Sequence, residues 1–72
     1  MAKDSVYRIT ELVGTSKKSW EDAAANAVAA ASKTLRDLRV AEIMKLDMVV
    51  ENGKVTSYRA KVALSFKYDP KK

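Results

Sequence analysis

The dipeptide Asn52-Gly53 lies between two long segments of β-branched, aromatic and other apolar residues, residues 39–50 and 55–68. Both central positions of a type I′ turn require a positive φ angle, which Asn and Gly tolerate better than other residues. The dipeptide therefore predicts an antiparallel hairpin built from these two segments. Because the chain has 72 residues, this hairpin must form a large part of any domain that the chain makes.

The two hairpin segments differ in how their apolar residues are spaced. Residues 55–68 alternate between an apolar phase and a more charged one, as a strand with two different faces requires. The two phases are Tyr58, Ala60, Val62, Leu64, Phe66 and Tyr68, and Ser57, Arg59, Lys61, Ala63, Ser65 and Lys67. Residues 39–50 are apolar in both phases. The expected sets there are Val40, Met44, Leu46 and Met48 on one side, and Ala41, Ile43 and Val49 on the other.

The first half of the chain predicts a strand followed by a helix. Residues 5–13 mix β-branched and aromatic residues with charges, and Gly14 is expected to end this strand in a turn over 14–16. Ser19 and Asp22 form a capping-box pattern, in which each side chain satisfies the backbone amide of the other residue. Apolar residues then recur at intervals of three and four, which predicts a helical stripe that ends near Arg36-Asp37. The stripe comprises Trp20, Ala23, Ala24, Ala27, Val28, Ala31, Leu35 and Leu38.

The predicted order is β-α-β-β, an α+β fold with a three-stranded antiparallel sheet and one helix packed across one face. One helix covers one face only, so a neighbouring copy of the chain is the expected cover for the other face. The chain contains neither Cys nor His, so it has no disulfide or Cys/His zinc site to stabilise a small core, which also favours self-association. Residues 1–72 are interpreted as a single domain, with flexible tails at 1–4 and 69–72.

Composition also bounds the function. Without Cys and His there is no Ser-His or Cys-His hydrolase, and no convergent acid-base pair is visible, so an enzyme is not expected. The net charge of +5 makes nucleic acid or another polyanion the alternative partner, although the basic residues are scattered. No apolar run reaches the ~18–20 residues of a membrane span, and no signal-peptide pattern opens the chain. We therefore expect a cytoplasmic protein without membrane contact.

The order and spacing of several short motifs resemble the dodecins, small β-α-β-β proteins that assemble as hollow dodecamers. The resemblance extends from Val6 to Phe66. It rests on Val6-Tyr7-Arg8, Leu12-Val13-Gly14-Thr15-Ser16, Ser19-Trp20-Glu21-Asp22-Ala23-Ala24, Ala41-Glu42, Val62 and Ser65-Phe66. The resemblance implies a hollow homododecamer with a non-enzymatic role, the binding and storage of a small ligand or an ion.

The resemblance to flavin-binding dodecins implies a pocket for FMN or riboflavin. In those proteins a Trp early in the second strand stacks on the flavin, and a Gln in the third strand hydrogen-bonds to the ring edge. The same positions are Val40 and Arg59 in this chain. Valine offers no π-face, and arginine is a donor only, suited to an anion such as phosphate. Val40, Arg59 and Lys45 are thus candidate ligand-binding residues that depart from the flavin pattern.

Residues 39–48 instead resemble the calcium dodecins, which share the opening Arg39-Val40-Ala41 and the pair Asp47-Met48. This subgroup implies Ca²⁺ as the ligand, with Asp47 and Glu42 as candidate metal-binding residues. Carboxylates are ligands for hard cations, and symmetry copies or backbone carbonyls would complete the coordination. The alternative for Asp47 is a salt bridge to Lys45 or Lys61. The ligand thus stays open between a flavin, Ca²⁺ and none.

Overall fold

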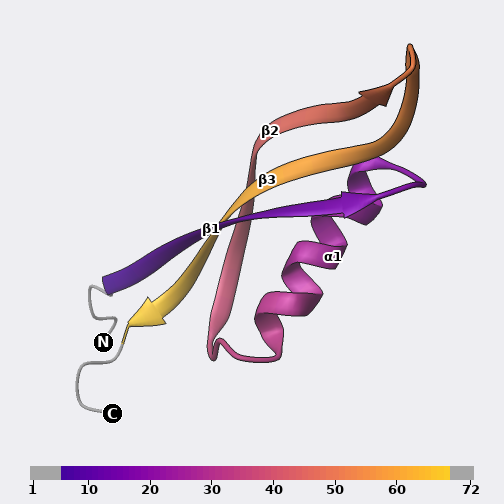
Figure 1. The fold of residues 1–72 in the computed structure, drawn as a ribbon. Helices are drawn as coiled ribbons and strands as arrows, with labels where there is room; N and C mark the ends of the chain where they lie inside the picture. Colours follow the sequence, from indigo (N-terminus) through magenta and orange to yellow (C-terminus); the bar gives the residue numbers. More distant parts are fainter. Residues whose placement is uncertain (1–5, 69–72) are drawn as a thin grey trace.

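The structure, a computed structural model, describes residues 6–68, which form three strands and one helix (Figure 1). In chain order these are β1 (Val6–Ser16), α1 (Trp20–Ser32), β2 (Leu38–Glu51) and β3 (Lys54–Tyr68). The sheet order is β1-β3-β2, and both strand pairs are antiparallel. This confirms the predicted α+β fold with its β-α-β-β order.

Two segments of the sequence prediction fall at the chain ends. Residues 1–4 and 69–72 were predicted as tails, and they lie outside the described residues. Between them, α1 runs along one face of the sheet and packs chiefly against β1 and β3 (Figure 1). Within residues 6–68, no helix has the length and apolar character that a bilayer crossing needs.

The β2–β3 hairpin turns at Asn52 and Gly53, as predicted. Their φ angles are 53° and 75°, the positive values that a type I′ turn requires at both central positions. The two strands differ from the predicted segments 39–50 and 55–68 by one residue at three of their four ends. The local turn chemistry therefore fixed the position of the hairpin.

The pairing of β2 with β3 is irregular, because the register shifts between Leu38 and Val40 and again between Ile43 and Lys45. Such a β-bulge inserts a residue without a partner and exchanges the faces of the residues that follow. A third shift lies between Val49 and Val50, close to the turn. The bulges explain why the sequence of β2 is apolar in both phases.

The bulges also overturn the predicted division of β2 into two faces. Val40 lies opposite Ser65, on the side of the sheet away from α1, whereas Leu46 lies opposite the buried Ala60, on the helix side. Met48 is on the helix side too, since it faces Tyr58. The prediction that Val40 shares a face with Leu46 and Met48 is therefore wrong, because two-residue alternation does not continue through a bulge.

β1 was predicted to end before Gly14, but in the structure it continues to Ser16. Gly14 is instead the point where β1 approaches α1 most closely. A Cβ atom at Gly14 would overlap the carbonyl oxygen of Ala23 and lie 3.0 Å from the Cβ of Ala27. The glycine is needed here for the close approach of two backbones, not to end the strand.

The start of α1 follows only half of the predicted capping box. Ser19 is the N-cap residue, and its hydroxyl accepts a hydrogen bond from the amide of Asp22 at 3.0 Å. The Asp22 carboxylate does not return the bond to Ser19 but accepts one from the hydroxyl of Ser16 at 2.7 Å. Ser16 in turn accepts from the amides of Lys18 at 2.9 Å and of Ser19 at 3.4 Å. The end of β1 therefore joins the cap.

The helix ends at Ser32 rather than near Arg36-Asp37. Leu35 lies in the connection and Leu38 begins β2, yet both pack against the core as the predicted stripe required. Asp37, with a φ of 59°, turns the chain into β2. The apolar spacing therefore correctly predicted that these two leucines contact the core, where both are partly buried, but not their secondary structure.

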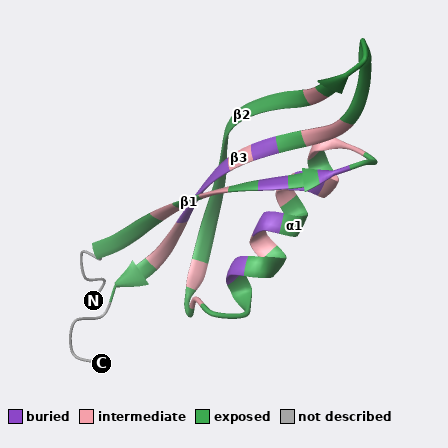
Figure 2. Ribbon diagram, viewed as in Figure 1, coloured by how far each residue is buried: buried purple, intermediate pink, exposed green. Residues whose placement is uncertain are grey.

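The core lies between α1 and the sheet, where purple marks the buried residues in Figure 2. Its buried members are small or β-branched, apart from one leucine: Ala23, Ala27, Ala31, Ala60, Val62 and Leu64. The side of the sheet away from α1, which we call the open face, carries no other element among residues 6–68 (Figure 1). β2 is exposed along nearly its whole length.

Candidate functional site

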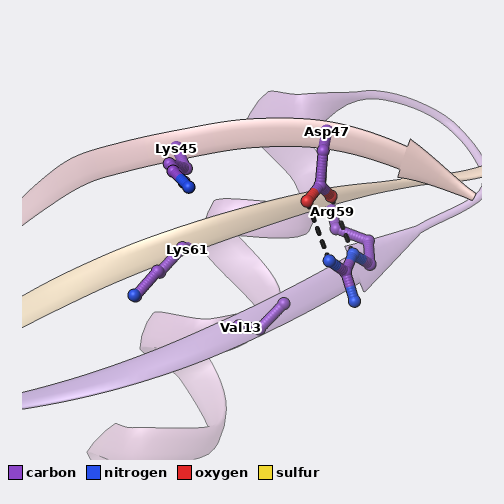
Figure 3. A pocket seen from close by; sticks show the side chains of 5 residues that line it. All are labelled: Val13, Lys45, Asp47, Arg59 and Lys61. Atoms are coloured by element: carbon purple, nitrogen blue, oxygen red, sulfur yellow. Dashed lines mark hydrogen bonds and ion pairs between the residues drawn. The ribbon is translucent and has the colours of Figure 1, made fainter.

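A pocket of about 290 Å³ lies on the open face and is formed by all three strands (Figure 3). β1 contributes Val13, β2 contributes Lys45 and Asp47, and β3 contributes Arg59 and Lys61. The structure therefore brings together three of the residues predicted from the sequence, Lys45, Asp47 and Arg59. The pocket is an opening on the surface whose walls are mostly charged side chains.

The β2–β3 register places the charged residues in two neighbouring rows. Lys45 lies directly opposite Lys61, and Asp47 lies directly opposite Arg59. Residues paired in this way have neighbouring Cβ atoms on the same face of the sheet. The bulge before Lys45 decides this arrangement, because it turns Lys45 and Asp47 to the open face.

Asp47 and Arg59 form a two-pronged ion pair. The Nε atom of Arg59 donates to Oδ1 of Asp47 at 2.7 Å, and its Nη2 atom donates to Oδ2 at 2.8 Å (Figure 3). Both side chains are about half exposed, at 49% for Asp47 and 45% for Arg59. The predicted alternative of a salt bridge to Lys45 or Lys61 is therefore wrong about the partner, because Arg59 is the residue opposite Asp47.

The ion pair shifts the protonation of both groups. The hydrogen bonds from Arg59 hold the pKa of the Asp47 carboxyl below its ordinary value. Desolvation opposes this shift, and the positive charges of Arg59 and Lys45 add to it. The same hydrogen bonds raise the pKa of the Arg59 guanidinium. Asp47 is therefore a carboxylate at neutral pH, with both oxygens engaged.

The positive charges of Lys45 and Lys61 are less well neutralised by nearby carboxylates. Lys61 Nζ lies 3.4 Å from the Glu11 carboxylate of β1, and both side chains are partly exposed. Lys45 has no carboxylate within salt-bridge distance among residues 6–68. Like charges directly opposite each other across two strands are destabilising. The pocket thus carries three cations and, with Glu11 at its edge, two carboxylates.

The other two predicted site residues lie further along β2. Val40 is opposite Ser65 and Glu42 is opposite Ala63, on the open face but outside the pocket. The row of Lys45 and Lys61 separates Glu42 from Asp47, so the two carboxylates do not converge within one chain. The described part of the chain holds no group of three or more His, Cys, Asp or Glu side chains that could bind a metal.

Two residues of the pocket were not among the predicted ligand positions. Lys61 was considered only as a partner for Asp47, although it shares with Arg59 the charged phase of residues 55–68. That shared phase is a signal that could have identified it. Val13 lies opposite Lys61 in the β1–β3 pairing. Nothing local in the sequence shows this contact, since the two strands are far apart along the chain.

Trp20 supports the pocket from the helix side. Its indole Nε1 donates a hydrogen bond to the backbone carbonyl of Asp47 at 3.0 Å. Its ring meets Tyr58 edge to face, with the ring centroids 5.1 Å apart. A smaller, mostly apolar pocket of about 170 Å³ lies beside it, lined by Trp20, Glu21, Ala24, Ile43 and Leu46. The start of α1 is therefore joined to the backbone of β2 at the residue that carries the ion pair.

Comparisons with known proteins agree in fold and in family. The sequence model of the Dodecin family matches residues 6–69. A curated relative, the calcium dodecin of Mycobacterium tuberculosis, is 44% identical over 66 residues, which cover 92% of this chain and 93% of the relative. The solved structure of a calcium dodecin from the same organism, described as having a novel calcium-binding site, matches with a TM-score of 0.79 and 45% identity, covering 94% of this chain and 97% of that one. Dodecin from Streptomyces coelicolor matches with a TM-score of 0.87 and 35% identity, covering 94% and 97% of the two chains.

Proposed function

Because the chain belongs to the dodecin family, we propose that it is a non-enzymatic binding and storage protein that assembles as a homododecamer. The ligand, a small molecule or an ion, binds on the open face of the sheet. The observation that carries the proposal is a charged pocket set among exposed apolar side chains, on a face that α1 does not cover. The exposed fraction is 65% for Ile9 and 54% for Val40.

Both faces of β2 support the assembly of several copies. Ile43, Leu46 and Met48 lie on the helix side, but about half of each side chain is exposed because α1 packs mainly on β1 and β3. Contiguous exposed apolar side chains of this kind mark contact surfaces. Closed symmetric assemblies are the usual way in which identical chains bury such surfaces. Contact with other copies would therefore cover β2 from both sides.

For the ligand we favour Ca²⁺, with Asp47 as its first carboxylate. The resemblance to the calcium dodecins points to this ion, and Asp47 is a charged, half-exposed oxygen donor in the pocket. Ca²⁺ requires six to eight oxygen ligands. Since both Asp47 oxygens accept from Arg59, the ion would either share the carboxylate with the guanidinium or displace it from one oxygen. The other ligands would come from backbone carbonyls, or from carboxylates such as Glu42 on a neighbouring copy.

The pocket is less suited to a flavin. Val40 has no ring that could stack on the isoalloxazine, and it lies outside the pocket. Arg59 supplies donors only, where the flavin-binding dodecins have an amide that can also accept. We therefore rank FMN and riboflavin below Ca²⁺.

The assembly is tested by the particle mass in solution. Static light scattering should give a mass near that of twelve chains. The mass should not change on dilution through the micromolar range. A monomer at every concentration would contradict both the homododecamer and the covered open face.

The calcium site is tested by titration calorimetry on four proteins. Wild type and the control Glu51→Gln, which removes an exposed acid near the turn, should give the same binding heat. Asp47→Asn should lose it. Arg59→Ala should bind Ca²⁺ at least as tightly as wild type, because the carboxylate no longer shares its oxygens with a guanidinium. Equal heats for Asp47→Asn and wild type would reject Asp47 as the ligand.

A further inference from the structure

We propose that Lys45, Lys61 and Arg59 form a site for an oxyanion of the phosphate type, either free or as the phosphate group of a small molecule. The inference rests on the proposed function in that it places a ligand on the same open face, and it adds the chemical class of that ligand. It uses the cations of the pocket, whereas the calcium proposal uses Asp47.

The first argument is the excess of positive charge in one row of the sheet. Lys45 and Lys61 face each other directly, an arrangement that destabilises two strands. Lys45 has no carboxylate within salt-bridge distance among residues 6–68, and the contact of Lys61 with Glu11 is long and partly exposed. Exposed pairs of this type contribute little to stability. An anion between the two ammonium groups would remove the repulsion.

The second argument is the β-bulge, which puts Lys45 in this row. Before the bulge Ile43 pairs with Val62, so an uninterrupted register would place Met44 opposite Lys61 and turn Lys45 to the helix side. The shift between Ile43 and Lys45 prevents this and brings Lys45 to the open face. Bulges often occur beside functional sites, where they redirect a side chain. Here the bulge redirects a cation toward another cation.

The third argument is the supply of hydrogen-bond donors. A guanidinium has five N–H groups, and Asp47 accepts from two nitrogens of Arg59, so Arg59 can donate to an anion while it stays paired. Each lysine adds an ammonium group with three donors. Figure 3 shows Lys45 and Lys61 on neighbouring strands, next to the strand positions that carry the Asp47–Arg59 pair. Phosphate oxygens are matched by such donors.

The site is tested by titration calorimetry in a phosphate-free buffer at low ionic strength, with inorganic phosphate and glycerol 3-phosphate as probes. Wild type should bind at least one of them. Lys45→Met and Lys61→Met should each weaken binding about tenfold or more, the loss expected for one charge-assisted hydrogen bond. The control Lys54→Met removes the same charge from an exposed lysine at the start of β3, and it should change the affinity less than about twofold.

A second readout separates a binding site from a fault in folding. Without phosphate, Lys45→Met should melt at or above the temperature of wild type, because it removes the repulsion from Lys61. Added phosphate should raise the melting temperature of wild type and Lys54→Met, but not that of Lys45→Met. If Lys45→Met instead melts well below wild type without phosphate, Lys45 has a structural role and the inference is wrong.

The remaining outcomes are distinct. Equal affinity for the two probes indicates a site for free phosphate, and tighter binding of the ester indicates the phosphate group of a larger ligand. No binding of either probe to wild type overturns the inference, and so does an equal loss in Lys54→Met and Lys45→Met, which indicates diffuse attraction of polyanions. If the particle mass matches twelve chains and Ca²⁺ gives the expected binding heat while phosphate does not bind, the proposed function stands and only the anion site fails.

Discussion

The carboxylate of Asp47 and the guanidinium of Arg59 meet across β2 and β3 through two hydrogen bonds, of 2.7 and 2.8 Å. This two-pronged geometry is the strongest way in which a carboxylate and an arginine pair. The pair neutralises one cation of the pocket. Of the two lysines that remain, Lys61 has a 3.4 Å contact with Glu11, and Lys45 has no carboxylate within salt-bridge distance among residues 6–68. The calcium ion proposed at Asp47 would therefore meet the positive charge of Arg59.

The pair should make stability depend on pH at acidic values. Hydrogen bonding from Arg59 lowers the folded-state pKa of Asp47, while the unfolded value is about 3.9. A lowered folded-state pKa stabilises the fold above the unfolded value, and this contribution disappears as the pH falls through the folded-state pKa. The melting temperature of wild type should therefore exceed that of Asp47→Asn by a constant margin above about pH 5, and by less as the pH falls below 4.

The same shift can be measured directly by an NMR titration of the Asp47 carboxyl carbon. Its pKa should be lower in wild type than in Arg59→Gln, because the variant lacks the charged donor. Glu51→Gln serves as the control for the loss of an unrelated acid. In the melting experiment, a temperature difference between wild type and Asp47→Asn that grows as the pH falls would contradict the predicted direction.

Gly14 and Gly53 should respond differently to the same substitution. Gly14→Ala places a methyl group against the Ala23 carbonyl, so the backbones of β1 and α1 must separate, and we expect a loss of about 3 kcal/mol or more. Gly53→Ala meets no atom within 4 Å but keeps a φ of +75°, which costs about 1–2 kcal/mol. Urea unfolding at matched protein concentration measures both. Equal losses would refute the role of close packing at Gly14.

Ser16 should contribute to the start of α1 although it lies in β1. Ser16→Ala removes a buried hydroxyl that donates to Asp22 and accepts from two amides, so we expect a loss of about 1–2 kcal/mol. The control is Ser32→Ala, which removes an exposed hydroxyl that donates to the Val28 carbonyl and should cost less than about 0.5 kcal/mol. Urea unfolding compares the two. If Ser16→Ala is as stable as the control, Ser16 does not stabilise the start of the helix.

Flavin binding should be absent in wild type and should return with two substitutions. Riboflavin fluorescence should stay unquenched on addition of wild type, since Val40 cannot stack on the flavin and Arg59 offers the ring edge no acceptor. Val40→Trp combined with Arg59→Gln restores the two residue types of the flavin-binding dodecins and should quench it. The control is Val55→Trp combined with Arg59→Gln, with its Trp at an exposed position near the turn. Strong quenching by wild type would contradict our ranking of the ligands.

The sequence by itself determined the features that depend on neighbours along the chain. Asn52 and Gly53 set the hairpin because positive φ angles are a property of those two residues. Ser19 marked the helix start, and the alternation of residues 55–68 separated the two faces of β3. The order of these local signals was also enough to indicate the dodecin family, which the comparisons confirmed.

Only the tertiary structure decided which residues lie opposite each other on neighbouring strands. The bulges of β2 shift its pairing with β3, so the partner of Asp47 could not be found by counting residues. The role of Ser16 in the cap likewise depends on two segments, β1 and the start of α1, that meet in space. The physical reason is that strand register sums many contacts between distant residues, and one inserted residue exchanges the two faces.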